Sequence, residues 1–168
     1  MGAAAKLTSS DIKIVPTCFE KAVISAFEVQ LSSKVTVKSV SMKPDVAATM
    51  SVGCMSTVML QCASLTGALA IAFPVPTFLA LLERMIDEKA TAITAENSDA
   101  AGEMLNIIYA SGRKEINEKG FDFGPAIPST VYGQGLALSK SNMAGTALYF
   151  DCECDLGRFG VMLSLRTN

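Results

Sequence analysis

The chain has 168 residues and half of them are apolar, which is enough to bury one hydrophobic core without disulfides or a structural metal. Charged residues make up 18% of the chain and balance to a net charge of −2 without a basic block, so nucleic acid and anionic membranes are not expected as partners. Histidine is absent, which excludes Ser-His and Cys-His catalysis and removes the commonest zinc ligand.

The cysteines and the N-terminal residues indicate a cytoplasmic protein. The five cysteines are odd in number and lie in apolar or alternating stretches, where cysteine commonly packs as a small hydrophobe, so we expect a reducing compartment. Residues 1–10 lack the apolar core of a signal peptide and are expected to form a loosely ordered lead-in. The most apolar window, 57–82, is interrupted by Gly67, Pro74 and Pro76 and is too broken for a membrane span. We therefore predict one soluble domain over residues 1–168.

The first half of the chain predicts one helix followed by strands. Pro16 suits a first helical turn and apolar residues at helical spacing follow it, so a helix is expected from about Val15 to Leu31. Alternating and apolar runs then predict three strands in an antiparallel meander, over 34–43, 47–57 and 58–73, with a hairpin turn at Ser64–Gly67.

The second half predicts two helices followed by strands. An apolar stripe predicts a helix over 77–88, and a longer helix is expected over about 94–120, with Asn97 or Ser98 as its cap. Strands are then expected over 127–131, 136–140, 146–153 and 160–166, with turns at 133–135, 142–145 and 155–157. The fold class is therefore α+β, an antiparallel sheet of about six strands with helices on one face, in the order α-β-β-β-α-α-β-β-β. It is pseudo-duplicated, because a helix followed by about three strands occurs twice.

The helix predicted over about 94–120 separates polar from apolar residues. At 100° per residue, one polar strip about 80° wide contains Asp99, Glu103, Asn106, Ala110, Arg113 and Asn117. The opposite face is apolar and is expected to lie on the sheet; it consists of Ala101, Met104, Leu105, Ile108, Tyr109, Gly112 and Ile116. Glu103 and Asn106 should therefore point outward together, one turn apart.

Asn106 is unusual at this position because asparagine is a weak helix former and here interrupts an apolar run. On pattern alone, Glu103 and Asn106 are compatible with two solvated residues on an exposed helix face, since an E-x-x-N spacing arises readily by chance. The pattern by itself does not assign a function.

The stretch from Asp99 to Asn106, with Gly120 to Gly133 after it, resembles the signature of the CheC/CheX family of chemotaxis phosphatases, in its CheX-like branch. That signature has Ser or Asp, then Glu, then Asn at the spacing of Asp99, Glu103 and Asn106, followed by a distant proline. Pro128 follows Asn106 after 21 intervening residues, one fewer than the family's spacing. The predicted order of helices and strands is also similar to the family's layout.

This resemblance implies a phosphatase that hydrolyses the aspartyl phosphate of a CheY-like receiver protein. It assigns catalysis to Asn106, which orients the attacking water, and to Glu103, which docks on the receiver's active-site lysine; Asp99 is a supporting residue. Arg113 lies on the same strip and is a possible docking residue. No metal or cofactor is expected on this chain, because the receiver holds the Mg²⁺ of the reaction.

The resemblance also implies one site per chain and a homodimer. Family members with two sites carry a second E-x-x-N on the first helix. In this chain the residue three positions after Glu20 is Val23 and the one three positions after Glu28 is Leu31, so neither motif has an Asn. CheX-like members join their sheets edge to edge, so we expect a homodimer with two sites.

Two other interpretations remain open at this stage. One is a non-catalytic adaptor of the same fold that binds receivers or other signalling proteins. The other is a structural or redox protein built around Cys152 and Cys154, which lie on one face of a predicted strand. Packing is the ordinary role for such cysteines, because no further Cys or His pair completes a metal site.

Overall fold

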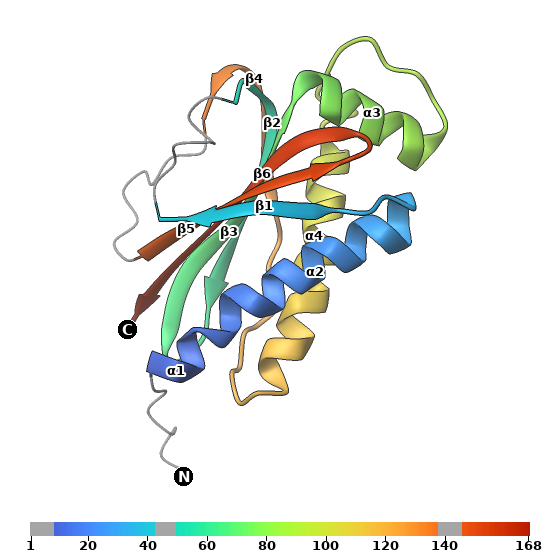
Figure 1. Cartoon of the computed structure of the whole chain (residues 1–168). Helices are drawn as coiled ribbons and strands as arrows, with labels where there is room; N and C mark the ends of the chain where they lie inside the picture. Colours follow the sequence, from blue (N-terminus) through green and yellow to red (C-terminus); the bar gives the residue numbers. More distant parts are fainter. Residues whose placement is uncertain (1–8, 43–49, 138–145) are drawn as a thin grey trace.

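The computed structural model describes residues 9–42, 50–137 and 146–168 (Figure 1). The elements follow the predicted order, except that a four-residue helix precedes the first predicted helix. Their bounds are α1 Ser9–Ile12, α2 Ile14–Leu31, β1 Thr36–Ser41, β2 Val52–Gln61, β3 Leu65–Pro74, α3 Val75–Ile86, α4 Asp99–Asn117, β4 Ser129–Leu136, β5 Thr146–Cys154 and β6 Gly157–Thr167. The strand predicted over 136–140 and the turn over 142–145 lie almost wholly outside the described residues; Leu136 ends β4.

The six strands form one antiparallel sheet in the order β1-β5-β6-β3-β2-β4, which confirms the α+β prediction. The predicted meander of the first three strands is wrong, because β1 pairs with β5 at the opposite side of the sheet from β2. The two halves of the chain occupy equivalent places in this sheet. If β1 is exchanged with β4, β2 with β5 and β3 with β6, the same strand order is obtained, read from the opposite edge. Each half of the chain therefore lends its first strand to the hairpin of the other half, and local alternation cannot reveal such an exchange.

Two turns that were predicted at glycines are wrong, because these glycines lie within strands. Leu65, Thr66 and Gly67 belong to β3, and the hairpin turn lies at residues 62–64, where the Cys62 amide donates to the Leu65 carbonyl at 2.9 Å. Gly67 is needed inside the strand because a Cβ there would collide with the Ser164 backbone of β6. Residues 133–135 lie within β4, where Gly133 and Gly135 have φ of 146° and 73°. They form an irregularity opposite Val52 and Cys54 of β2, a bulge that glycine permits.

The main core lies between the helices and one face of the sheet, as predicted. α2 contributes Phe27, whose ring stacks on Phe159 of β6 with centroids 4.5 Å apart. α2 also packs on α4, where a Cβ on Gly112 would come within 2.6 Å of the Phe19 ring. Small size at Gly112 thus allows the two helices to approach closely.

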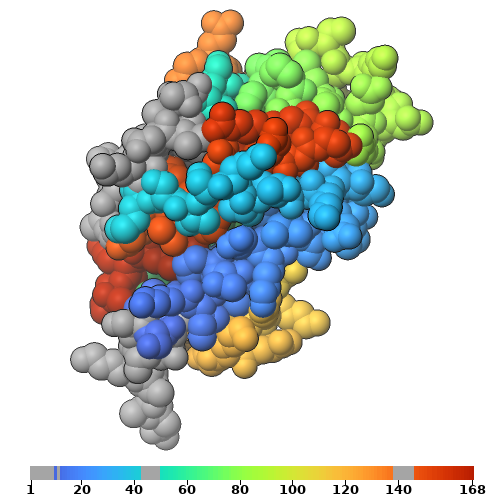
Figure 2. Space-filling model, in the orientation of Figure 1, coloured from blue at the N-terminus to red at the C-terminus, as the bar shows by residue number. Residues whose placement is uncertain are grey.

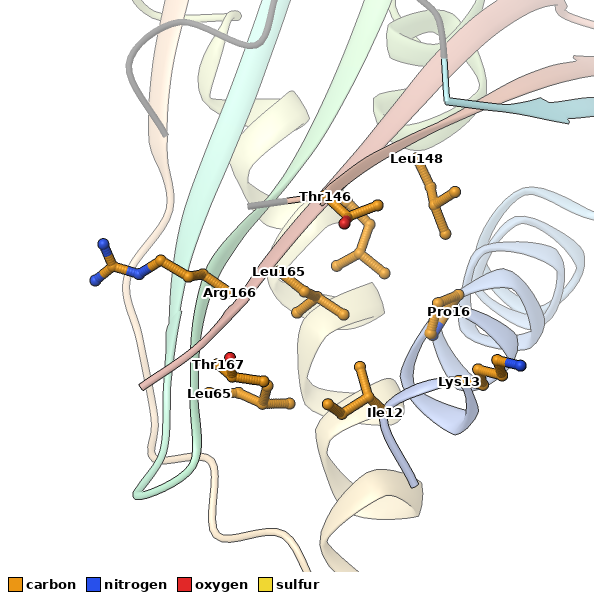
Figure 3. A pocket seen from close by; sticks show the side chains of 10 residues that line it. Ile12, Lys13, Pro16, Leu65, Thr146, Leu148, Leu165, Arg166 and Thr167 are labelled. Atoms are coloured by element: carbon orange, nitrogen blue, oxygen red, sulfur yellow. The ribbon is translucent and has the colours of Figure 1, made fainter. Parts of the chain in front are cut away.

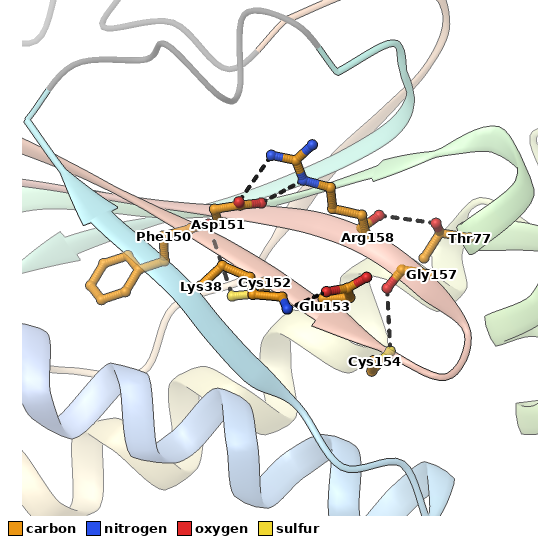
Figure 4. Close-up of polar contacts among 9 residues, drawn as sticks. All are labelled: Lys38, Thr77, Phe150, Asp151, Cys152, Glu153, Cys154, Gly157 and Arg158. Carbon is orange, nitrogen blue, oxygen red and sulfur yellow. Dashed lines mark hydrogen bonds and ion pairs between the residues drawn. The ribbon is translucent and has the colours of Figure 1, made fainter.

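Polar side chains join the β5–β6 hairpin to β1 and to α3. Figure 2 shows α2 and β1 beside the red β5–β6 hairpin on one face of the molecule. Across these strands Lys38 pairs with Glu153 at 2.8 Å, and Arg158 contacts Asp151 at 2.7 and 2.9 Å (Figure 4). Thr77 of α3 donates to the Arg158 carbonyl at 2.9 Å.

A second set of contacts holds the hairpin turn. The Asp155 carboxylate accepts hydrogen bonds from the Ser33 hydroxyl and from the Arg84 guanidinium, the latter at 2.7 Å. Arg84 also donates to the Leu31 carbonyl at 3.3 Å, so one side chain joins the ends of α2 and α3 to the turn.

Across the three described ranges, no helix is both long and apolar enough to cross a membrane.

Candidate functional site

α4 lies with its predicted apolar face against the core. All seven residues of that face are buried: Ala101, Met104, Leu105, Ile108, Tyr109, Gly112 and Ile116. On the other side Asp99, Glu103 and Asn106 are exposed. The predicted polar strip is therefore present on the surface along the first two turns of α4.

The start of α4 differs from the predicted capping. The helix begins at Asp99, but no side chain caps it. The Ser98 hydroxyl donates instead to the Ala95 carbonyl at 3.0 Å, and the Asn97 amide oxygen accepts from the Thr94 backbone at 2.8 Å. These contacts build the turn that leads into the helix. Asp99 remains in the first helical turn, where a carboxylate interacts favourably with the helix dipole.

After α4 the chain turns back and runs along the helix toward its start (Figure 1); we call residues 123–128 the return segment. The Asn117 side chain begins it with two hydrogen bonds, accepting from the Phe123 amide at 2.9 Å and donating to its carbonyl at 3.0 Å. Further along, the Tyr109 hydroxyl donates to the Gly124 carbonyl at 2.6 Å. Burial raises the pKa of Tyr109, which keeps this hydroxyl a donor.

The return segment ends where Pro128 lies against α4. A Cβ built on Gly102 would be 3.9 Å from the Pro128 Cβ and 3.0 Å from the Thr130 hydroxyl. This close approach brings Pro128 next to the turn that carries Glu103, although 24 residues separate them in sequence. Thr130 donates to the Ser56 hydroxyl at 3.1 Å, which fixes β4 to β2 beneath the helix.

At the C-terminal end of the predicted strip, Arg113 and Asn117 make contacts within the molecule. Arg113 is half-buried, with its guanidinium 5.9 Å from the centre of the Tyr109 ring, a cation–π contact. Asn117 is half-buried and holds Phe123 as described above. Three predicted site residues, Asp99, Glu103 and Asn106, are thus together and exposed, whereas Arg113 is partly engaged elsewhere.

Sequence reasoning missed the residues that position Pro128. Tyr109 was expected only as a core residue, and its hydroxyl contact with Gly124 has no periodic signal. Gly102, Thr130 and Ser56 carry no signal beyond small size, since close packing between helix and strand depends on the tertiary arrangement.

The cysteines belong to the packing. Burial raises the pKa of Cys54 to about 11 and that of Cys152 to about 12, so neither thiol is a reactive thiolate near neutral pH. Cys154 donates to the Gly157 carbonyl at 3.6 Å within the hairpin (Figure 4). Within the described part of the chain, no group of three or more Cys, Asp or Glu side chains is arranged to hold a metal ion.

An apolar cavity of about 460 Å³ lies elsewhere, between the start of α2 and the ends of β5 and β6. Figure 3 shows Ile12, Leu65 and Leu165 facing one another there, with the charged ends of Lys13 and Arg166 directed away. Its lining includes neither Glu103 nor Asn106, so it is separate from the candidate site.

Comparison with known proteins adds the family context. Residues 55–151 match the family described as "Chemotaxis phosphatase CheX". Among solved structures, chemotaxis protein CheX from Vibrio vulnificus is similar, with a TM-score of 0.81 and 18% identity over 91% of this chain and 99% of that one. A CheC-like superfamily protein from a Shewanella species also has a TM-score of 0.81, at 17% identity over 95% of this chain and 99% of that one.

A third similar structure is the CheX–CheY–BeF3–Mg complex from Borrelia burgdorferi. Its TM-score is 0.65, with 21% identity over 90% of this chain and 97% of that one. Among curated proteins, none matches this chain in sequence. At these identities the structural likenesses concern the fold, and the matched family region includes Asp99, Glu103, Asn106 and Pro128.

Proposed function

This chain belongs to the chemotaxis phosphatase CheX family, and on that premise we propose that it hydrolyses the aspartyl phosphate of a CheY-like response regulator. One observation carries the proposal for this particular chain. Glu103 and Asn106 stand exposed together on a helix whose opposite face is buried, beside the proline that ends the return segment. A rigid helix is a suitable carrier for two side chains that must enter another protein's site.

Asn106 is the residue proposed to act on the water. Hydrolysis of an acyl phosphate needs a water molecule held in line with the phosphorus more than it needs covalent help from the enzyme. The neutral amide of Asn106 can accept from and donate to that water without repelling the phosphoryl oxygens. A carboxylate at the same position would repel them, which favours asparagine over aspartate there.

Glu103 is proposed to dock, one turn away from Asn106. Its carboxylate would pair with the receiver's active-site lysine and so place the amide over the phosphoryl group. Asp99 would support the start of α4, and Arg113 would contribute at the edge of the contact. Mg²⁺ would be held by the receiver.

We propose one site per chain and a homodimer with two sites. α2 is the counterpart of α4 when the two halves are exchanged. Where an E-x-x-N motif would have its Asn, three residues after each Glu, α2 has Val23 and Leu31, and both are buried. Neither position offers an amide to a partner. A dimer whose sheets join edge to edge would leave one separate α4 site on each chain.

The test is loss of phosphate from phosphorylated receivers of the source genome, with and without this protein. Asn106→Ala should lower the rate by about 10² or more, roughly 2.7 kcal/mol of barrier, while receiver binding persists. Glu103→Lys should weaken binding itself, because it places a cation opposite the receiver's lysine. Ser111→Ala, exposed on α4 outside the strip, is the matched control and should behave like wild type.

The alternative is an adaptor that binds receivers without hydrolysis. It would replace the proposal if the wild-type protein bound a phosphorylated receiver but left its dephosphorylation rate unchanged. An Asn106→Ala protein as active as wild type would remove Asn106 from the mechanism.

A further inference from the structure

Ile127 is the most exposed large apolar side chain in the described part of the molecule, at 90%. A single exposed isoleucine is ordinary on a protein surface. Ile127, however, lies in the return segment, which is fixed to α4 at both ends, at Gly124 by Tyr109 and at Pro128 by its approach to Gly102. The side chain is therefore held out from a rigid support.

The two fixed points lie on either side of Asn106 along the helix. On a helical wheel Asn106 is about 40° from Gly102 and about 60° from Tyr109, so all three face the side of α4 along which the return segment runs. The chain between Gly124 and Pro128 must therefore pass beside Asn106. Pro125 and Pro128 restrict its backbone, Ala126 packs on the core, and Ile127 is the large apolar side chain of this stretch that faces outward, beside the exposed Pro125 ring.

A partner that reaches Asn106 will consequently also meet Ile127. Resting on the proposed function, we infer that Ile127 is an apolar anchor for the phosphorylated receiver, covered by an apolar patch at the rim of the receiver's phosphorylation pocket. Glu103 supplies the polar contact on the helix, and Ile127 supplies apolar area that loses water on docking. Ile127 thus contributes to binding and takes no part in the chemical step.

Steady-state dephosphorylation of a CheY-type receiver, charged with a small-molecule phosphodonor, separates these roles. Ile127→Asp should raise KM for the phosphorylated receiver at least tenfold and leave kcat within about twofold of wild type. The reason is that the lost contact stabilises the bound receiver equally before and during the chemical step. Ile127→Leu should restore the wild-type KM. Val29→Asp is the matched control, since Val29 is 72% exposed on α2, outside the return segment. Both positions are exposed, so the variants should keep the wild-type melting temperature.

A wild-type KM for Ile127→Asp, in a protein where Asn106→Ala is inactive, would overturn this inference and leave the proposed function standing. A change of molecular mass in Ile127→Asp would also overturn it, because the anchor would then serve a second copy of this chain. Wild-type protein inactive on every receiver would be a failure of the proposed function, and the inference would fall with it.

Discussion

Two buried tyrosines use their hydroxyls differently. Tyr109 donates to the Gly124 carbonyl and so holds the return segment on α4. The hydroxyl of Tyr149 is also buried, on the other face of the sheet, and the described residues offer it no hydrogen-bond partner. Removing the two oxygens should therefore have opposite consequences, because an unpaired buried hydroxyl costs free energy that a paired one recovers.

We predict that Tyr109→Phe lowers the free energy of unfolding by about 0.5–1.5 kcal/mol and also lowers kcat/KM, since Pro128 and Ile127 lose a fixed point. Tyr149→Phe should leave stability unchanged or raise it. Urea denaturation of both variants, with receiver dephosphorylation measured in parallel, is the check. No loss of stability in Tyr109→Phe would contradict the Gly124 contact, and a loss in Tyr149→Phe would show that the Tyr149 hydroxyl has a partner.

At the scale of helices and strands, the sequence predicted what periodicity encodes. The α4 face was predicted because seven apolar residues recur at helical spacing, and the structure buries all of them. The neighbours of β1 were not predictable, since alternation marks a strand without naming its partner. The return segment has no periodicity, and the family resemblance gave only the sequence spacing of Pro128, so its nearness to Glu103 was not predicted and is known from the contact with Gly102.

The contact of α2 and α3 with the β5–β6 hairpin should depend on pH through Asp155. Hydrogen bonds from Ser33 and then from Arg84 hold the pKa of this carboxyl below its ordinary 3.8. A lowered pKa in the folded state means that the stabilisation is complete above the unfolded value and is lost as pH falls through the folded value.

We therefore predict that Asp155→Asn reduces the free energy of unfolding at pH 7, and that its difference from wild type shrinks at acidic pH, as the pH falls through the lowered pKa and the Asp155 carboxyl becomes neutral. Urea titrations at pH 7 and at acidic pH measure this difference. Glu88→Gln, an exposed acidic residue after α3, serves as the control and should track wild type throughout. A constant difference between Asp155→Asn and wild type at both pH values would rule out the carboxylate as its source.

At the scale of the whole molecule, the sheet ends in two edges, β1 and β4. The β4 edge is interrupted by the bulge at Gly133 and Gly135 and adjoins the return segment. β1 carries Val40 and is followed directly by Met42; these side chains are 47% and 68% exposed and lie beyond the register shift of β1 at Val37. An apolar edge of this kind is open to pairing with another strand.

We predict a dimer of twice the 17.7 kDa chain mass, joined through β1. Val40→Lys should halve the mass measured by light scattering, because a lysine would be buried at the joined edge. Val131→Lys, the corresponding change on β4, should leave the mass unchanged. A monomeric wild type, or a dimer broken only by Val131→Lys, would refute this arrangement.

The exchange of first strands between the two halves has a consequence for how the chain folds. Thr36 pairs with Glu153, so β1 has no neighbour until nearly all of the described chain exists. During synthesis α2 and the β2–β3 hairpin can form early, but the sheet closes only after the β5–β6 hairpin has left the ribosome. Contacts so distant in sequence form slowly. The native sheet is therefore completed only after the second half of the domain has been made, and until then Phe27 of α2 lacks its ring contact with Phe159 of β6.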